Sequence, residues 1–192
     1  MFKKYPKSGP FYPDFLGALA QLLYDRFQVC MSFALFRSMK YTNVLIEDHE
    51  ALRKLMKQIK SARLSPKKKA NAYDLFVDLL ESHTLAEEQS LYKIRKENAW
   101  LRPDILEGLQ EHRIAEDLMA KIQRTRNPDL QEAKKKVLCD YVEHHLKEEE
   151  EDLFPHFEKT ISAHQSRALQ DLYLQIRLET QKNPTDLSHG AL

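Results

Sequence analysis

Glycine is scarce in this sequence, and its scarcity argues against a strand-rich fold. The chain has four glycines among 192 residues, whereas sheets normally need more glycine in their turns. Apolar residues make up 42% of the chain and charged residues 31%, a balance typical of a soluble helical protein. The length suits one domain with a substantial core. We therefore expect an all-α fold.

Cysteine and net charge are also low. Cys30 and Cys139 are too few and too far apart in sequence for a disulfide framework, so a reducing, cytoplasmic setting is expected. The formal net charge of +1 gives no electrostatic footprint for nucleic acid. No glycine-rich loop for phosphate is present, and no residue spacing supports hydrolytic chemistry.

Long apolar runs are missing as well, and no secretory signal opens the chain. The most hydrophobic window, residues 15–36, has about the length of a membrane span. It is interrupted near its centre by four polar or charged residues, Gln21, Asp25, Arg26 and Gln28. We therefore expect no membrane span, but an amphipathic helix over Asp14–Met39 that docks on a partner or forms a homodimer.

Prolines divide the rest of the chain into helices. Each of three later helices begins with a first-turn proline, at Ser65-Pro66, Arg102-Pro103 and Asn127-Pro128. Four long helices joined by short turns predict an antiparallel up-down-up-down four-helix bundle. We predict three parts: an N-terminal extension with one amphipathic helix (1–39), the bundle (40–160), and a C-terminal helix with a tail (161–192). The terminal helices would pack outside the bundle.

Each central helix carries a histidine on its apolar line. The second helix is expected to run to about Asn98, and the fourth has an inward line of Leu138, Tyr141, His145, Glu149 and Asp152, with a kink or end near Pro155. The four histidines are His49, His83, His112 and His145. Two of them are followed four positions later by a glutamate, Glu87 and Glu149, which lies on the same helix face.

Two interpretations of this pattern compete. Any one histidine is readily explained as a core residue with a satisfied hydrogen bond, and any one glutamate as a surface carboxylate. A bare carboxylate inside a bundle costs several kcal/mol unless it is paired or bound to metal, which favours the second interpretation. Four imidazoles and two carboxylates can hold two metal ions, with the carboxylates bridging them. Such donors, without thiolate, suit iron, manganese or zinc.

Four segments resemble the hemerythrin-like HHE cation-binding domain family. They are Asp48-His49-Glu50, His83-x-x-x-Glu87-Glu88, Glu111-His112 and His145-x-x-x-Glu149-Glu150-x-x-Leu153-Phe154-Pro155. Their order and spacing agree with the family over Thr42 to Glu158. The resemblance implies two iron ions bridged by an oxo or hydroxo group and by the two glutamates. The implied ligands are His49, His83, Glu87, His112, His145 and Glu149.

The sequence departs from the oxygen-carrying hemerythrins at one position. Those proteins have a second histidine four residues after the third-helix histidine, where this chain has Glu116. The chain thus resembles bacterial four-histidine members, including those implicated in nitric-oxide handling and repair of iron–sulfur clusters. Glu111 matches the glutamate that these members carry before the third-helix histidine.

Several neighbours of the ligands have open roles. Glu116 is a seventh ligand, a hydrogen-bond partner of a ligand, or a solvated residue. His144 points about 100° away from His145 on its helix and is a second choice. Four carboxylates adjoin candidate ligands and are candidates to orient imidazole N–H groups: Glu50, Glu88, Glu111 and Glu150.

Three functions remain open at this point. The first is binding or sensing of a diatomic gas, O2 or NO, at a coordination position that the six side chains leave open. The second is iron donation or iron–sulfur cluster repair. The third is a non-enzymatic interaction module, in which metal acts as a structural clamp and Asp14–Met39 as the docking surface. The sequence leaves catalytic turnover undecided.

Overall fold

The structure is a computed structural model that describes residues 40–182, and these residues form helices and no strand. Four long helices come first: α2 Tyr41–Ile59, α3 Pro66–Gln89, α4 Arg102–Arg124 and α5 Pro128–Glu148. The shorter elements are η1 (Leu91–Lys96), η2 (Glu149–Leu153), α6 (Phe154–Thr160) and the longer C-terminal helix α7 (Ala163–Lys182). The all-α prediction is confirmed. The expected helix Asp14–Met39, with its docking or dimer role, lies outside the described residues.

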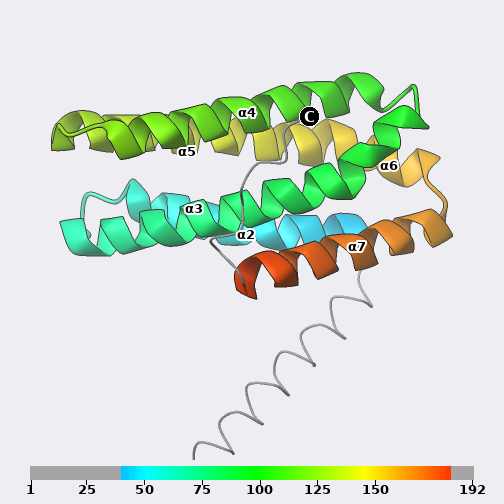
Figure 1. The fold of residues 1–192 in the computed structure, drawn as a ribbon, viewed down its shortest axis with the longest axis horizontal. Coiled ribbons are helices and arrows are strands. Elements are labelled where there is room, and N and C mark those ends of the chain that lie inside the picture. The colour runs from blue at the N-terminus through cyan, green and yellow to red at the C-terminus, as the bar shows by residue number, and fades with distance from the viewer. Residues whose placement is uncertain (1–39, 183–192) are drawn as a thin grey trace, which may run out of the picture. The chain divides into compact units, whose positions relative to one another are not determined.

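The four long helices make an antiparallel up-down-up-down bundle, as predicted. In Figure 1, α2 and α3 form one pair and α4 and α5 the other, and each helix reverses the direction of the one before it. The C-terminal helix α7 lies along α3 and α2, on the side away from α4 and α5 (Figure 1). None of the helices in residues 40–182 is both long and apolar enough to cross a membrane.

A polar cap and a proline start α3 and α5 where the sequence predicts. The Asn127 side chain accepts a hydrogen bond from the Leu130 N–H at 2.9 Å, and Pro128 opens α5. Ser65 is the corresponding cap of α3, with Pro66 in the first turn. A cap satisfies an amide that has no partner inside the helix, and proline costs nothing there because its missing N–H would be unpaired anyway.

The second long helix ends earlier than expected. It stops at Gln89 instead of continuing to about Asn98, and a 3-10 turn, η1, follows. Ser90 adopts φ −121° and ψ −87°, and its hydroxyl donates to the Ala86 carbonyl. The Tyr41 hydroxyl holds the same Ser90 oxygen at 2.7 Å. Side-chain bonds of this kind compete with the helical backbone, which explains the break.

The inward line of the fourth helix also differs from the prediction. Asp152 is exposed, while Leu153 is buried, because residues Glu149–Leu153 form a π-helical turn. A π turn holds more residues than an α turn and so shifts which side chain faces inward. Pro155 lies just beyond it, in the first turn of α6, and supplies no backbone N–H to continue the α ladder.

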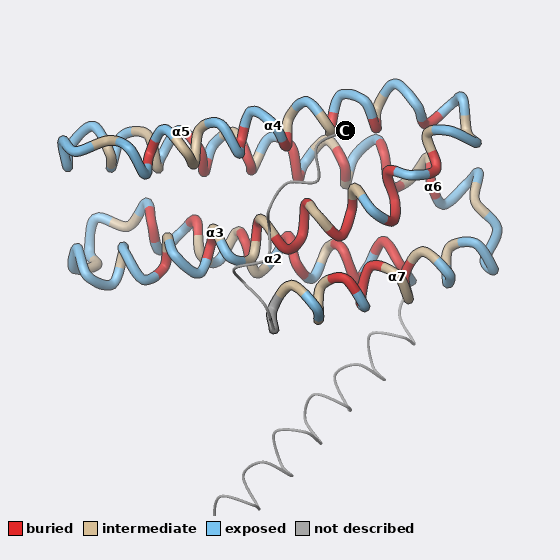
Figure 2. Tube along the Cα trace, in the orientation of Figure 1, coloured by how far each residue is buried: buried red, intermediate tan, exposed pale blue. Residues whose placement is uncertain are grey.

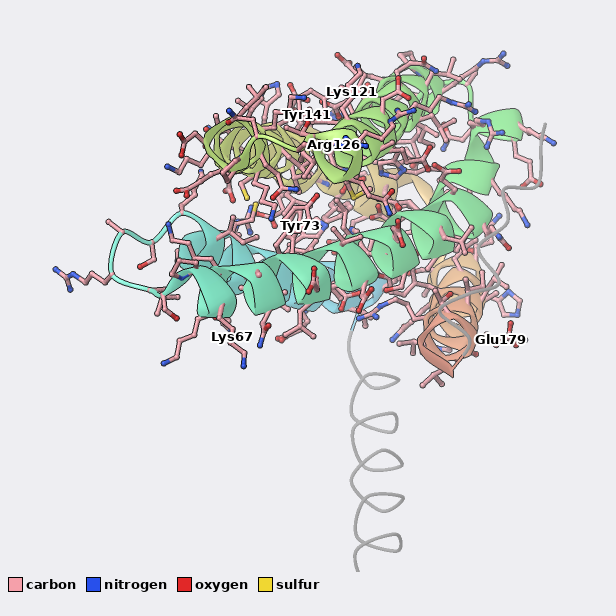
Figure 3. The ribbon with its side chains drawn as sticks, turned by 60° about the vertical axis from the view of Figure 1, so that its left-hand side comes forward. Lys67, Tyr73, Lys121, Arg126, Tyr141 and Glu179 are labelled. Atoms are coloured by element: carbon pink, nitrogen blue, oxygen red, sulfur yellow. The ribbon has the colours of Figure 1, made fainter. Side chains whose placement is uncertain are left out.

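One end of the bundle holds a dry core. Its buried members come from all four long helices: Leu52, Met56, Ile59, Ala72, Phe76, Leu80, Ala115, Ile122, Leu138, Cys139, Val142 and Leu146. Figure 2 shows buried segments lining the facing sides of the helices. Tyr73, labelled in Figure 3, packs against this core and carries Lys135 of α5 over its ring at 4.2 Å. The candidate site occupies the opposite half of the bundle.

Two leucines of α3 test how much this dry core stabilises the fold. Leu80 is 1% exposed and Leu75 is 58% exposed. We expect Leu80→Ala to lower the free energy of unfolding by about 2–5 kcal/mol, because it leaves a cavity. Leu75→Ala is the matched control and should change it by less than about 0.5 kcal/mol. Urea unfolding of the metal-free protein followed by circular dichroism measures both, and equal losses would contradict the assigned core.

Candidate metal centre

The six predicted ligands meet in one buried cluster. His49, His83 and Glu87 are fully buried, and His112, His145 and Glu149 are at most 3% exposed. His49 and His112 lie in the first halves of α2 and α4, whereas the other four residues lie at or near the ends of α3 and α5. Because neighbouring helices run in opposite directions, these positions reach the same depth of the bundle.

The histidines form two pairs. The His49 and His83 rings lie 5.0 Å apart, and the His112 and His145 rings 4.8 Å apart, each pair edge to face. In the second pair the two Nε2 atoms face each other at 3.1 Å. Each pair thus points imidazole nitrogens into one small volume.

Each glutamate lies between the two pairs. Glu149 Oε2 is 3.4 Å from His49 Nε2 and 3.7 Å from His145 Nε2. Glu87 Oε2 is 3.3 Å from His83 Nε2 and 3.6 Å from His112 Nε2. Each carboxylate oxygen therefore lies within 3.7 Å of one imidazole of each pair.

The outer nitrogen of each imidazole is held by an acceptor. Nδ1 of His49 lies 2.8 Å from Glu150, that of His112 lies 3.0 Å from Glu88, and that of His145 lies 2.7 Å from Glu111. His83 Nδ1 lies 2.7 Å from the Tyr173 hydroxyl. A carboxylate at Nδ1 fixes the proton there, so the Nε2 lone pair of the ring faces the centre of the cluster.

Three of the four carboxylates proposed to orient the histidines thus contact them. The fourth, Glu50, is directed to Arg53 instead, at 3.3 Å from its Nη1. Arg53 also binds Glu150 at 2.8 Å, so it neutralises the carboxylate that holds His49. The negative charge of Glu150, on the outer side of His49, is therefore balanced by Arg53.

The inward atoms lack partners, and this tests whether the residues fit a metal. His49 Nε2, His83 Nε2, both oxygens of Glu87 and Glu149 Oε2 are buried without a hydrogen bond. Such unpaired buried groups are costly and rare. Each of these atoms offers a lone pair. A single N–H or O–H hydrogen cannot satisfy all five atoms, whereas bound cations can. Ligand atoms around one ion lie roughly 3 Å apart, close to the spacing observed here.

Two overlapping groups can each surround one ion. The first consists of His49, His83, Glu87 and Glu149, and the second of Glu87, His112 and His145. Within each group the ligand atoms lie within 4.8 Å of one another. Glu87 belongs to both groups, so the donor set fits two neighbouring cations.

Burial and neighbouring charges shift the pKa values of the two glutamates in opposite directions. Burial, and then the charge of Glu149, raise the pKa of Glu87 well above its usual range. Burial opposes ionisation of Glu149 too, but His145 and His49 outweigh it and lower the pKa of that carboxyl. Burial lowers the pKa of His83 to about 4, so this ring is neutral, as metal ligation requires. A cation at the centre would favour the ionised form of both carboxylates.

Other sequence candidates lie outside the cluster. Glu116 is exposed on α4 and belongs to neither buried group, because the helix turns Ala115 toward the core instead. Whether Glu116 is a hydrogen-bond partner of a ligand or a solvated residue stays a prediction. The His144 side chain is 62% exposed and pairs with Glu148 at 3.1 Å. Glu111 is the exception, since it contacts His145.

A tyrosine that the sequence pattern does not mark also reaches the site. The Tyr92 hydroxyl donates to Glu149 Oε1 at 2.6 Å, and the Tyr92 ring stacks on His112 at 5.1 Å. Gly108 of α4 makes this possible, because a Cβ there would lie 3.0 Å from Tyr92 Cζ and closer still to the hydroxyl. A rare glycine inside a helix is the signal that could have pointed to this close approach.

Substitution of Gly108 tests the close packing of Tyr92 against α4. In an ordinary helix, Gly→Ala stabilises by roughly 0.5–1 kcal/mol. Here Tyr92 is fully buried and cannot move freely, so we expect Gly108→Ala to destabilise by about 1–3 kcal/mol through overpacking. Adding Tyr92→Phe to Gly108→Ala should recover part of this loss, because it removes the closest atom. Thermal unfolding of the single and double variants decides it, and a stabilised Gly108→Ala protein would refute the assignment.

Comparisons with known proteins place this geometry in a family. The family profile described as the hemerythrin HHE cation binding domain matches residues 41–157. The fold is similar to the crystal structure of a hemerythrin HHE cation-binding domain-containing protein from Mycobacterium kansasii. That similarity has a TM-score of 0.63 and 21% identity, and covers 79% of this chain and 95% of the other. A comparison with curated proteins gave no match. From the profile match and the buried histidine–glutamate cluster, we conclude that this chain belongs to the hemerythrin HHE cation-binding domain family.

Proposed function

We propose that this protein is a non-haem di-iron protein that binds or senses a diatomic gas, O2 or NO. One observation carries the proposal: each of two buried glutamates lies within 3.7 Å of one imidazole of each pair, and its inward oxygen has no hydrogen-bond partner. The residues that would hold the two ions are His49, His83, Glu87, His112, His145 and Glu149. Two iron ions, when bound there, would supply reversible redox chemistry and an exchangeable coordination position.

The donor set favours iron over soft-metal alternatives. It consists of imidazole and carboxylate, which suit iron, manganese and zinc. Cys139 lies in the dry core, and burial raises the pKa of its thiol to about 12, so it offers no thiolate to the site. Manganese and zinc are the expected substitutes.

The protein's own residues prepare the site for a small ligand. Six side chains cannot fill every position of two six-coordinate ions, which leaves room for a diatomic molecule. Phe154 stacks on the His49 ring at 5.6 Å, and the preceding residue, Leu153, is also buried. These apolar groups limit water at the site and strengthen its electrostatic interactions. Tyr92 holds the outer oxygen of Glu149, so that its other oxygen faces the histidines.

The described residues give less support to the other two functions. A cysteine pair near the mouth of the bundle would favour cluster repair, but Cys139 is buried in the dry core and Cys30 lies outside the described residues. The interaction-module hypothesis depends on Asp14–Met39, which also lies outside them. Its homodimer and the cytoplasmic location stay predictions.

Metal loading tests the first half of the proposal. We expect anaerobic Fe2+ to bind at two ions per chain and to raise the melting temperature, because ligands that bind the folded state stabilise it. Glu87→Gln should weaken binding by at least about tenfold, while leaving the metal-free protein at least as stable as the unmodified protein, because an uncompensated buried carboxyl is removed. Asp78→Asn, on the exposed face of the same helix, is the matched control. Elemental analysis and calorimetric titration would contradict the site if both variants bound iron alike.

Gas exposure tests the second half. The anaerobic ferrous protein should change its visible spectrum on addition of O2 or NO, because either gas would occupy the open coordination position. The zinc-loaded protein is the control and should stay silent. A ferrous spectrum that is inert to both gases would reject gas binding while leaving metal binding intact.

A further inference from the structure

One of the four histidines, His83, is held by a residue that lies outside the region matched by the family profile. The family match ends at residue 157, whereas α7 spans Ala163–Lys182. Tyr173 of α7 is fully buried, and its hydroxyl lies 2.7 Å from His83 Nδ1. A helix that the sequence suggests to be peripheral therefore touches a candidate metal ligand.

His83 differs from the other three histidines in its partner. Each of the others has a carboxylate at its Nδ1, at 2.7 to 3.0 Å, which comes from α3, α4 or the turn η2. The carboxylate nearest to His83 is Asp48, whose Oδ2 is 3.6 Å from Nδ1, too far for a direct hydrogen bond. The Tyr173 hydroxyl bridges this gap, because it donates to Asp48 Oδ2. Its oxygen is then free to accept the Nδ1–H of His83.

The charge of Asp48 is fixed in turn by α7. Arg177 Nε donates to Asp48 Oδ2 at 2.7 Å, Nη2 donates to Oδ1, and Nη1 donates to Ser82 Oγ at 3.2 Å. This forked contact holds a guanidinium and a carboxylate in one orientation.

We propose that α7 is part of the metal centre: Arg177, acting through Asp48 and Tyr173, is a positioning residue for His83. The chain of donors runs from His83 Nδ1–H to the Tyr173 oxygen, and from the Tyr173 O–H to the Asp48 carboxylate that Arg177 holds. It keeps the proton on Nδ1 and directs the Nε2 lone pair toward the group formed by His49, His83, Glu87 and Glu149. This inference rests on the proposed metal binding.

Packing alone does not account for these contacts. Leu174 and Ile176 already give α7 an apolar side for docking, and exposed Glu179, labelled in Figure 3, marks its solvent side. The Tyr173 ring also packs against Tyr41 at 5.8 Å, a contact that needs no hydroxyl. The role of the hydroxyl can thus be separated from the role of the ring.

A consequence is that metal occupancy and docking of α7 strengthen each other. If the donor chain increases the affinity of His83 for metal, bound metal must stabilise the donor chain by the same factor, because coupling between two equilibria is reciprocal. Hydrogen exchange of the α7 amides should therefore slow when metal is added.

Cobalt titration of Tyr173→Phe tests the inference. Co2+ alone serves as the probe, because its visible absorption reports coordination at each ion. The unmodified protein should take up two ions, and Tyr173→Phe should bind one of them about 10–100-fold more weakly, the range found for outer hydrogen-bond partners. Tyr41→Phe is the matched control, since it removes a buried hydroxyl bonded to Ser90 instead of a ligand. It should bind both ions as the unmodified protein does.

A second variant and a second readout cover the possibility of misfolding. Arg177→Met should weaken the same ion as Tyr173→Phe, while Arg167→Met, on the exposed part of α7, should not. Long-range proton–nitrogen NMR of the zinc-loaded protein should show His83 protonated on Nδ1, and this signal should weaken in both affected variants.

The outcomes separate the two proposals. Wild-type affinity for both ions in Tyr173→Phe and Arg177→Met would overturn the positioning role while leaving metal binding in place. Equal weakening in Tyr173→Phe and Tyr41→Phe would also overturn it, as a general effect of lost hydroxyls. Failure of the unmodified protein to bind cobalt, iron or zinc would overturn the proposed function and this inference with it.

Discussion

Two buried carboxylates govern the structure of this bundle. Glu87 and Glu149 lie in an interior where an unpaired charge costs several kcal/mol. His145 and His49 favour the charge on Glu149, whereas neither oxygen of Glu87 has a hydrogen-bond partner. The residues around them keep that arrangement: carboxylates and a tyrosine hold the outer ring nitrogens, Arg53 pairs with Glu150, and Arg177 pairs with the Asp48 carboxylate behind Tyr173. The apolar core at the other end supplies the stability that offsets this local cost. Without cations, the site half is therefore the less stable half.

Both glutamates lie where regular helix ends. Glu87 is in the last turn of α3, just before the break at Ser90, and Glu149 opens the π turn η2. Each irregularity belongs to a local chemical cause, a serine that bonds back to its own helix in one case and a proline in the other. Irregular turns of this type occur often at functional sites. In this bundle they allow the residues after the ligands, Leu91 and Leu153, to return to the interior.

Much of this site could be predicted because its information is local. The spacing of His83 to Glu87 and of His145 to Glu149 places each pair on one helix face, and the prolines locate the helix starts. Three of the outer carboxylates were also found, since each adjoins a ligand in sequence. Glu116 shows where the same rule fails: it has the spacing of a ligand from His112, but the packing of Ala115 turns it outward.

The rest of the site depends on long-range contacts that no periodicity carries. Tyr173 meets His83 across 90 residues, and Arg177 meets Asp48 across 129. Tyr173 and Arg177 occupy positions that any amphipathic helix could have, so the sequence predicts only that the C-terminal helix packs outside the bundle. The role of Tyr92 could not be predicted for a similar reason. Its ring lies against Gly108, and this contact exists only once α4 and η1 are packed together.

The position of Cys139 bears on how the protein would tolerate the reactive gases proposed as its ligands. Its sulfur is fully buried among aliphatic side chains, and its thiol stays protonated at neutral pH. Oxidation and nitrosation both act through an accessible thiolate. Within the part of the chain that the structure describes, the protein therefore offers no cysteine thiolate to a reactive oxygen or nitrogen species. Such molecules would meet a core in which the thiol is shielded by its neighbours.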